Sequence, residues 1–281
     1  MKSFDINRFG KMLRWVVGVN IRSLLIWSLG YVVGVFLGEQ MFFALSVDRD
    51  LSDVLGKISQ FCSIFIIIAL CVGIGTLFVG LNKKPRREAF LMLPASNLEK
   101  FLAVVVYVTF IWTFFVILSY VAGDTLRMVY RALVNGDAWI STVSMVADTN
   151  TPNFVRLFSQ ESSLWYLMMN TFVVCAFLVW IHSLYILGGT LFRKYSFVVS
   201  SLVFILAMWL FVWLEGHLHL TIFSSSWEGG HCVKQIVGPL AYVLAVVLPL
   251  LSCFNYWASF HIFKNIELIS NKWTNYDILK R

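Results

Sequence analysis

The stretch YSFVVSSLVFILAMWLFVWL, from Tyr195 to Leu214, decides the fold class because it runs for 20 residues without a charged side chain. A helix of this length is long enough to cross the roughly 30 Å hydrocarbon layer of a bilayer. Its apolar residues follow one another without the every-second-residue alternation that is typical of a membrane barrel strand. The stretch therefore predicts a transmembrane helix.

Five further runs of similar length and composition occur along the 281-residue chain, and only the first of them contains a charge, Glu39. These runs cover residues 23–45, 58–81, 101–123, 164–187 and 236–256. The chain has 59% apolar and 13% charged residues and a mean hydropathy of +0.79, whereas soluble domains have about 45–50% apolar and about 25% charged residues. We therefore expect an all-α integral membrane protein, with six transmembrane helices in a single domain over 1–281.

The basic residues predict the orientation of the chain. Of the 22 Lys and Arg residues, 16 fall in the segments that lie on the same side of the membrane as the N-terminus. Cytoplasmic loops retain positive charge, so both termini are predicted to be cytoplasmic. The net charge of +7 is then explained by topology and by attraction to anionic membrane lipids, and no nucleic-acid partner is expected.

Residues 1–22 contain five basic side chains before the first apolar run begins. One face of a helix over these residues is apolar, a pattern typical of a helix that lies in the headgroup layer. This face consists of Ile6, Phe9, Leu13, Val16 and Val17. We expect an amphipathic N-terminal interfacial helix here. The alternative is a simple cytoplasmic extension of the first span.

Titratable residues are rare within the predicted spans. Glu39 lies near the outer end of the first span and is interpreted as an interfacial carboxylate rather than a proton site. His182 is interpreted as a hydrogen-bonded packing residue rather than a ligand. The absence of paired ionisable residues within the spans argues against ion-driven transport. No catalytic motif and no nucleotide-binding loop occurs in the sequence, so we predict neither catalytic residues nor enzyme activity in this chain.

Residues 124–163 and 215–235 are predicted to be outer loops. The second contains His217, His219, His231 and Cys232, which do not have a recognised zinc spacing. No metal site is therefore predicted, and the apolar residues between them are expected to form a short element that dips into the outer interface.

The first span has glycines at every fourth position, Gly30, Gly34 and Gly38. This spacing places three residues without side chains on one helix face, where another helix can approach closely. The partner helix belongs either to a second copy, across a dimer interface, or to this chain.

The inner loop over 82–100 reads NKKPRREAFLMLPASNLEK. Its basic residues mark it as cytoplasmic, and its apolar run from Ala89 to Leu93 is too short to span the membrane. Ser96 and Glu99 have the spacing of a helix-capping box that starts the third span. An exposed apolar turn beside cationic residues predicts a docking site for a partner protein. The alternative is a turn that rests on the lipid surface.

The six-span layout and the stretch RREAFLMLPASNLEK, from Arg86 to Lys100, resemble the membrane subunit of type-2 ABC transporters, the export-type permeases. The resemblance implies a short coupling helix that sits in a cleft of a separate ATPase subunit, and a re-entrant outer element over Glu215 to Lys234. The coupling residues that it implies are Arg86, Arg87, Glu88, Phe90, Leu91, Met92, Leu93 and Pro94.

By this resemblance, the chain is expected to be a permease subunit of an ATP-driven exporter in the bacterial cytoplasmic membrane. It would form the transport path as a dimer, with a second copy or a similar permease. The chain itself would bind no cofactor, because ATP and Mg would lie on the ATPase. The alternative is an accessory or scaffolding membrane protein that does not transport.

Overall fold

The computed structural model describes residues 4–45, 51–81, 88–90, 92–134, 139–150, 164–192, 195–218, 221–228 and 231–265. Six helices among these residues are long and apolar enough to cross a membrane. They confirm the predicted helical class and all six predicted spans. The chain is thus a multi-pass membrane protein that divides into two compact units.

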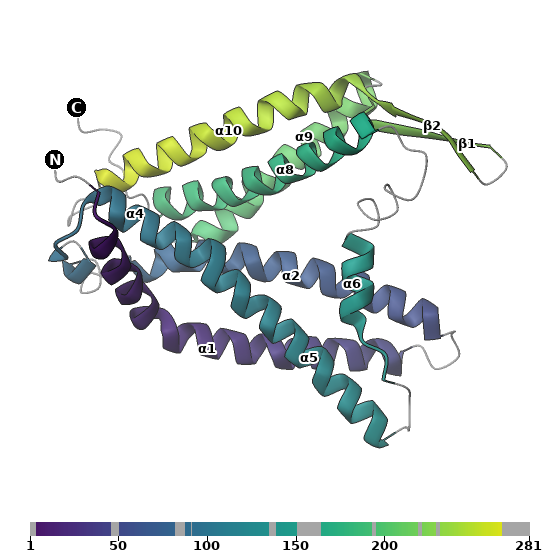
Figure 1. Cartoon of the computed structure of the whole chain (residues 1–281), viewed down its shortest axis with the longest axis horizontal. Helices are drawn as coiled ribbons and strands as arrows, with labels where there is room; N and C mark the ends of the chain where they lie inside the picture. The colour runs from purple at the N-terminus through teal and green to yellow at the C-terminus, as the bar shows by residue number, and fades with distance from the viewer. Residues whose placement is uncertain are drawn as a thin grey trace. The chain divides into compact units, whose positions relative to one another are not determined.

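Unit 1 consists of Met1–Gly73 and Leu98–Pro152. It contains α1 (Ile6–Ala44), most of α2 (Leu51–Leu81), and the helix built from α4 (Asn97–Val106), η1 (Tyr107–Trp112) and α5 (Thr113–Val134), followed by α6 (Thr142–Asn150). Figure 1 labels α1, α2, α4, α5 and α6. Their core is formed by residues from α1, α2, α5 and α6. It contains Val35, Val54, Ile58, Cys62, Tyr120 and Val146.

Helix α1 continues without a break from Ile6 through the first predicted span. Both interpretations of residues 1–22 predicted a helix, and the structure places one from Ile6 onward; Figure 1 shows its first turns at an angle to the rest. The Asp5 side chain accepts a hydrogen bond from the Asn7 backbone N–H at 2.8 Å. This contact is an N-cap, which satisfies one of the amide groups that a helix leaves free at its start.

The third span is longer than predicted, because the helix continues past Gly123 to Val134. Residues 124–134, predicted to belong to an outer loop, are thus part of this helix. Residues 142–150 of the same predicted loop form a separate helix, α6. The predicted span ended at the first charged residue, Asp124. That charge does not end the helix, because it is paired inside the protein. Within this span η1 is π-helical, a local widening that occurs often at functional sites.

Unit 2 consists of Ile74–Asn97 and Asn153–Arg281. Its long helices are α8 (Leu164–Leu191), α9 (Ser196–Leu218) and α10 (Pro239–Lys264), and α8 packs against both α9 and α10. The Asn255 side chain of α10 donates to the Ser183 hydroxyl of α8 at 3.0 Å. The Ser196 hydroxyl, at the start of α9, donates to the Gly75 carbonyl of α2 at 2.9 Å.

A β-hairpin follows α9. Strands β1 (Phe223–Glu228) and β2 (His231–Val237) pair antiparallel, from Phe223 opposite Val237 to Glu228 opposite His231. The resemblance implied a re-entrant element in this region, and the residues themselves gave no prediction of strands. The sequence does contain a hairpin signal, since Gly229 and Gly230 fall between the two strands.

Candidate functional site

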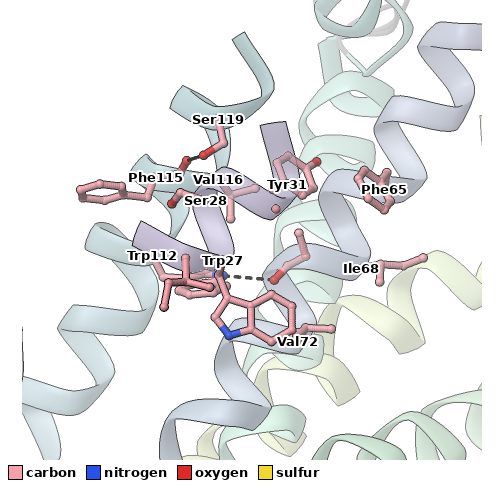
Figure 2. Close-up of a pocket in the computed structure, with 13 residues that line it drawn as sticks. Trp27, Ser28, Tyr31, Phe65, Ile68, Val72, Trp112, Phe115, Val116 and Ser119 are labelled. Carbon is pink, nitrogen blue, oxygen red and sulfur yellow. Dashed lines mark hydrogen bonds between the residues drawn. The ribbon is translucent and has the colours of Figure 1, made fainter. Parts of the chain in front are cut away.

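An apolar pocket of about 430 Å³ lies in unit 1 between α1, α2 and the helix formed by η1 and α5. Figure 2 shows its aromatic side chains, which come from all three helices. They are Trp27, Tyr31, Phe65, Trp112 and Phe115. None of the residues that line the pocket is charged, so its chemistry suits an uncharged, mainly apolar group.

Trp112 fixes one wall of this pocket. Its indole Nε1 donates to the Ala69 carbonyl of α2 at 3.1 Å (Figure 2). The ring lies directly on Gly73, where an added Cβ would overlap the indole. At Gly30 an added Cβ would meet no atom within 4 Å, so the missing side chain leaves open space in the pocket wall.

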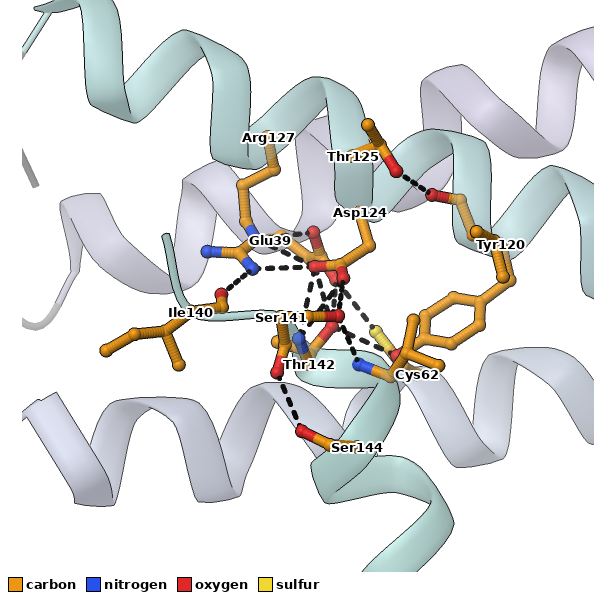
Figure 3. A network of polar contacts seen from close by, with 12 residues as sticks. Glu39, Cys62, Tyr120, Asp124, Thr125, Arg127, Ile140, Ser141, Thr142 and Ser144 are labelled. Atoms are coloured by element: carbon orange, nitrogen blue, oxygen red, sulfur yellow. Dashed lines mark hydrogen bonds and ion pairs between the residues drawn. The ribbon is translucent and has the colours of Figure 1, made fainter. Parts of the chain in front are cut away.

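A buried polar cluster lies elsewhere in unit 1 and is shown in Figure 3. We use this name for Glu39 of α1, Cys62 of α2, Tyr120, Asp124 and Arg127 of α5, and Ser141 and Thr142 at the start of α6. Glu39 is 0% exposed, Asp124 1% and Arg127 3%. Charged side chains are almost never buried to this extent unless they are paired.

Arg127 is the cation of the cluster. Its Nη2 lies 2.6 Å from Asp124 Oδ1, and its Nε lies 3.0 Å from Glu39 Oε2. Nη2 also donates to the Ile140 carbonyl at 2.7 Å. The guanidinium thereby joins α1, α5 and the segment before α6. Removal of one partner from such a buried group is costly, because it leaves a charge without compensation.

The hydroxyl groups of Ser141 and Thr142 extend the cluster. Ser141 Oγ donates to Asp124 Oδ2 at 2.6 Å. Thr142 Oγ1 lies 2.9 Å from Asp124 Oδ1 and 3.0 Å from Glu39 Oε1. Cys62 Sγ, from α2, lies 3.4 Å from the same Glu39 oxygen.

The cluster corrects two interpretations made from the sequence. Glu39 is not an interfacial carboxylate, because the protein encloses it completely. Paired ionisable residues do occur within helices of membrane-spanning length, since Glu39 and Arg127 pair across α1 and α5. Asp124 and Arg127 lie beyond the charge-free run that predicted the third span, and the prediction therefore placed both in an outer loop. Their spacing of three residues, which places both on one helix face, was the available signal.

The glycine face of α1 packs, in part, within this chain. An added Cβ at Gly34 would lie 3.2 Å from the Phe65 ring, and one at Gly38 would lie 2.7 Å from the Phe61 ring. Both phenylalanines belong to α2. Of the two alternatives for this face, the structure shows internal packing at Gly34 and Gly38, whereas Gly30 borders the pocket.

The predicted coupling helix is described only in part, because Arg86, Arg87 and Leu91 lie outside the described residues. Residues 88–90 and 92 are helical. Phe90 is 3% exposed and its ring meets that of Phe263 on α10 edge-on, with centroids 5.9 Å apart, whereas Met92 is 82% exposed. The expected exposure of the apolar turn therefore holds for Met92 and is wrong for Phe90.

Leu93 ends this turn and Pro94 follows it, and the Leu93 backbone N–H donates to the Phe90 carbonyl at 3.4 Å. Ser96 then directly precedes α4, as the capping box predicted. Glu99 is fully buried, and its Oε1 accepts from the Asp5 backbone N–H at 2.8 Å and from Arg8 Nη2 at 3.0 Å. Through these hydrogen bonds the Glu99 side chain connects the start of α1 to the start of α4.

Two histidines considered in the sequence, His182 and His217, have hydrogen-bond partners in the structure. His182 Nδ1 lies 2.6 Å from the Tyr256 hydroxyl, which confirms the predicted hydrogen-bonded packing. His217 Nδ1 lies 3.0 Å from the Trp213 carbonyl, one turn earlier in α9. Within the described part of the chain, no three His, Cys, Asp or Glu side chains are grouped so that they would hold a metal ion.

Comparisons with protein-family models, with curated proteins and with solved structures found no match to this chain.

Proposed function

We propose that this chain is the permease subunit of an ATP-driven exporter of the type-2 ABC class, with both termini in the cytoplasm of a bacterial cell. The proposal rests on the resemblance of the stretch from Arg86 to Lys100 to the coupling region of these permeases. Six apolar helices of membrane-spanning length support it. The ATPase would be a separate chain that carries ATP and Mg. A second copy or a similar permease would complete the transport path.

The contacts of Phe90 and Met92, in the turn of the same stretch, also support the proposal. Met92 extends outward and is free to enter an apolar cleft of a partner, while Phe90 points inward and packs on Phe263 of α10. One side of the turn is thus available for docking, and the other is attached to the last span. A movement of the docked ATPase would be passed to α10 through the Phe90 ring.

The apolar pocket supports a cargo that is uncharged over most of its surface. Its wall contains no charged residue and several aromatic rings, as in sites for apolar ligands. A strongly ionic cargo would find no partner there.

The test is to solubilise the tagged, full-length chain from its native membranes and to identify the proteins that co-purify with it. We expect an ATPase with a nucleotide-binding loop of its own, together with ATP hydrolysis in the purified complex. Met92→Ala removes a side chain that would be buried in the complex, which costs about 1.5–3 kcal/mol. This substitution should therefore weaken the association by about tenfold or more.

Met168→Ala is the matched control, because Met168 is also exposed but lies on α8 within a span. It should leave the association unchanged. Absence of an ATPase from the wild-type complex would favour the accessory or scaffolding alternative. An ATPase that binds the Met92→Ala and wild-type chains equally would show that this turn is not the docking element.

A further inference from the structure

Thr142 occupies an unusual place in the polar cluster, between two carboxyl groups. Its Oγ1 lies 3.0 Å from Glu39 Oε1, 2.9 Å from Asp124 Oδ1 and 3.0 Å from the Tyr120 hydroxyl. A threonine hydroxyl has one hydrogen to donate and two lone pairs that accept. Its single hydrogen can make a full hydrogen bond to only one of the two carboxyl groups, and the other contact is a second full hydrogen bond only if that carboxyl group carries a hydrogen.

The remaining donors show which carboxyl is ionised. Asp124 accepts from Arg127 Nη2 at 2.6 Å, from Arg127 Nε at 3.1 Å, from Ser141 Oγ at 2.6 Å and from the Thr142 backbone N–H. These are the donors that stabilise a carboxylate. Glu39 Oε2 lies 3.0 Å from Arg127 Nε but receives no hydrogen bond, because that N–H is directed at Asp124.

The charges of the cluster lead to the same assignment. Two carboxylates facing one guanidinium would leave a net negative charge in an apolar interior, where an uncompensated ion is very costly. Among the described residues, the titratable groups that face Glu39 are Cys62 from α2 and Tyr120, Asp124 and Arg127 from α5. Arg131, the next basic residue of α5, has its guanidinium 3.7 Å from the centre of the Phe43 ring.

We propose that Glu39 is a buried proton-binding site, with the proton on Oε1 donated to Thr142 Oγ1. Thr142 then donates to Asp124 and also accepts from Tyr120, so that its hydrogen and both lone pairs are used. Arg127 and Asp124 form a neutral ion pair beside the uncharged Glu39. Loss of the proton places a second negative charge next to Asp124 and removes the hydrogen bond from Glu39 to Thr142. The proton thereby stabilises the packing of α1 against α5.

This site is separate from the proposed docking turn and does not depend on the exporter proposal. The direct test is infrared spectroscopy of the full-length chain in phosphatidylcholine bilayers at neutral pH. We expect the carbonyl stretching band of a protonated carboxyl group, shifted by exchange into D2O. Glu39→Gln should abolish the band. Glu88→Gln, the same change at an exposed position, should leave it intact. Absence of the band from the wild type, or its persistence in Glu39→Gln, would overturn the proposal.

Thermal unfolding gives a second test that does not rely on the band. Gln has the shape of a neutral Glu and its amide can donate to Thr142, so Glu39→Gln should keep the wild-type Tm. Asp124→Asn leaves Arg127 buried without a counter-charge and should lower the Tm by on the order of 10 °C. Equal effects of the two substitutions, or a larger effect of Glu39→Gln, would show that the proton is not on Glu39.

Discussion

The ring of Phe90 lies edge-on against the ring of Phe263, with centroids 5.9 Å apart, and this contact joins the turn before α4 to the end of α10. Tilted and edge-on aromatic pairs stabilise a structure by about 0.5–1.5 kcal/mol beyond the area that they bury. The turn therefore has two different sides, since Phe90 is buried against α10 and Met92 is exposed.

We predict that Phe90→Ala weakens the link to α10 without removing the exposed docking side chain. The proposed ATPase should still co-purify with this variant, but its hydrolysis should no longer respond to cargo. A double-mutant cycle with Phe263→Ala, followed by chemical unfolding, should give a coupling energy of about 0.5–1.5 kcal/mol. Additive effects of the two substitutions would show that the rings do not act together.

The glycines of α1 should respond differently to one and the same substitution. Gly38→Leu drives a side chain into the Phe61 ring and should lower the Tm in detergent. Gly30→Leu enters open space in the apolar pocket and should leave the Tm unchanged or raise it. If both variants lost stability equally, the pocket would already be filled by something that the leucine displaces.

Gly73→Ala should be destabilising although alanine favours helix formation, because its Cβ would overlap the Trp112 indole. Combination with Trp112→Phe, which replaces the indole by a smaller ring, should restore part of the stability that Gly73→Ala removes. The measurement is the unfolding midpoint of the single and double variants. If the unfolding midpoint of the double variant were no higher than that of Gly73→Ala, overlap with Trp112 would not be the cause of the destabilisation.

Arg127→Met should lower the free energy of unfolding by about 3–5 kcal/mol, because it leaves Asp124 buried without its counter-charge. Arg131→Met is the matched control. Its guanidinium packs on the Phe43 ring at 3.7 Å, and loss of this cation–π contact should cost only about 0.5–2 kcal/mol. Unfolding by denaturant at neutral pH measures both values. A loss at Arg127 no larger than that at Arg131 would contradict the assignment of Arg127 as the cation of the cluster.

The predicted orientation is tested with an impermeant thiol reagent on intact cells. The five native cysteines are first replaced, and single cysteines are introduced at Gly216 and Asn265, which are exposed at the ends of α9 and α10. Gly216→Cys should react from outside, and Asn265→Cys only after the cells are permeabilised. The reverse pattern would place the turn from Glu88 to Leu93 outside the cell, where no ATPase is available.

The sequence alone was sufficient to predict the six spans, the start of α4 after Ser96 and the hydrogen-bonded role of His182. Length and hydropathy act over some 20 adjacent residues, so they can be read without knowing which helices are neighbours. Capping likewise depends on residues a few positions apart.

Only the tertiary structure identified the polar cluster and the pocket. Glu39 and Thr142 are 103 positions apart, and nothing in the residues near either one indicates that they meet. Phe90 is part of an apolar run, yet its burial depends on Phe263 near the end of α10. In each case, packing between distant helices determines whether a side chain is paired, buried or exposed, and a local pattern contains no information about which distant helix will pack against it.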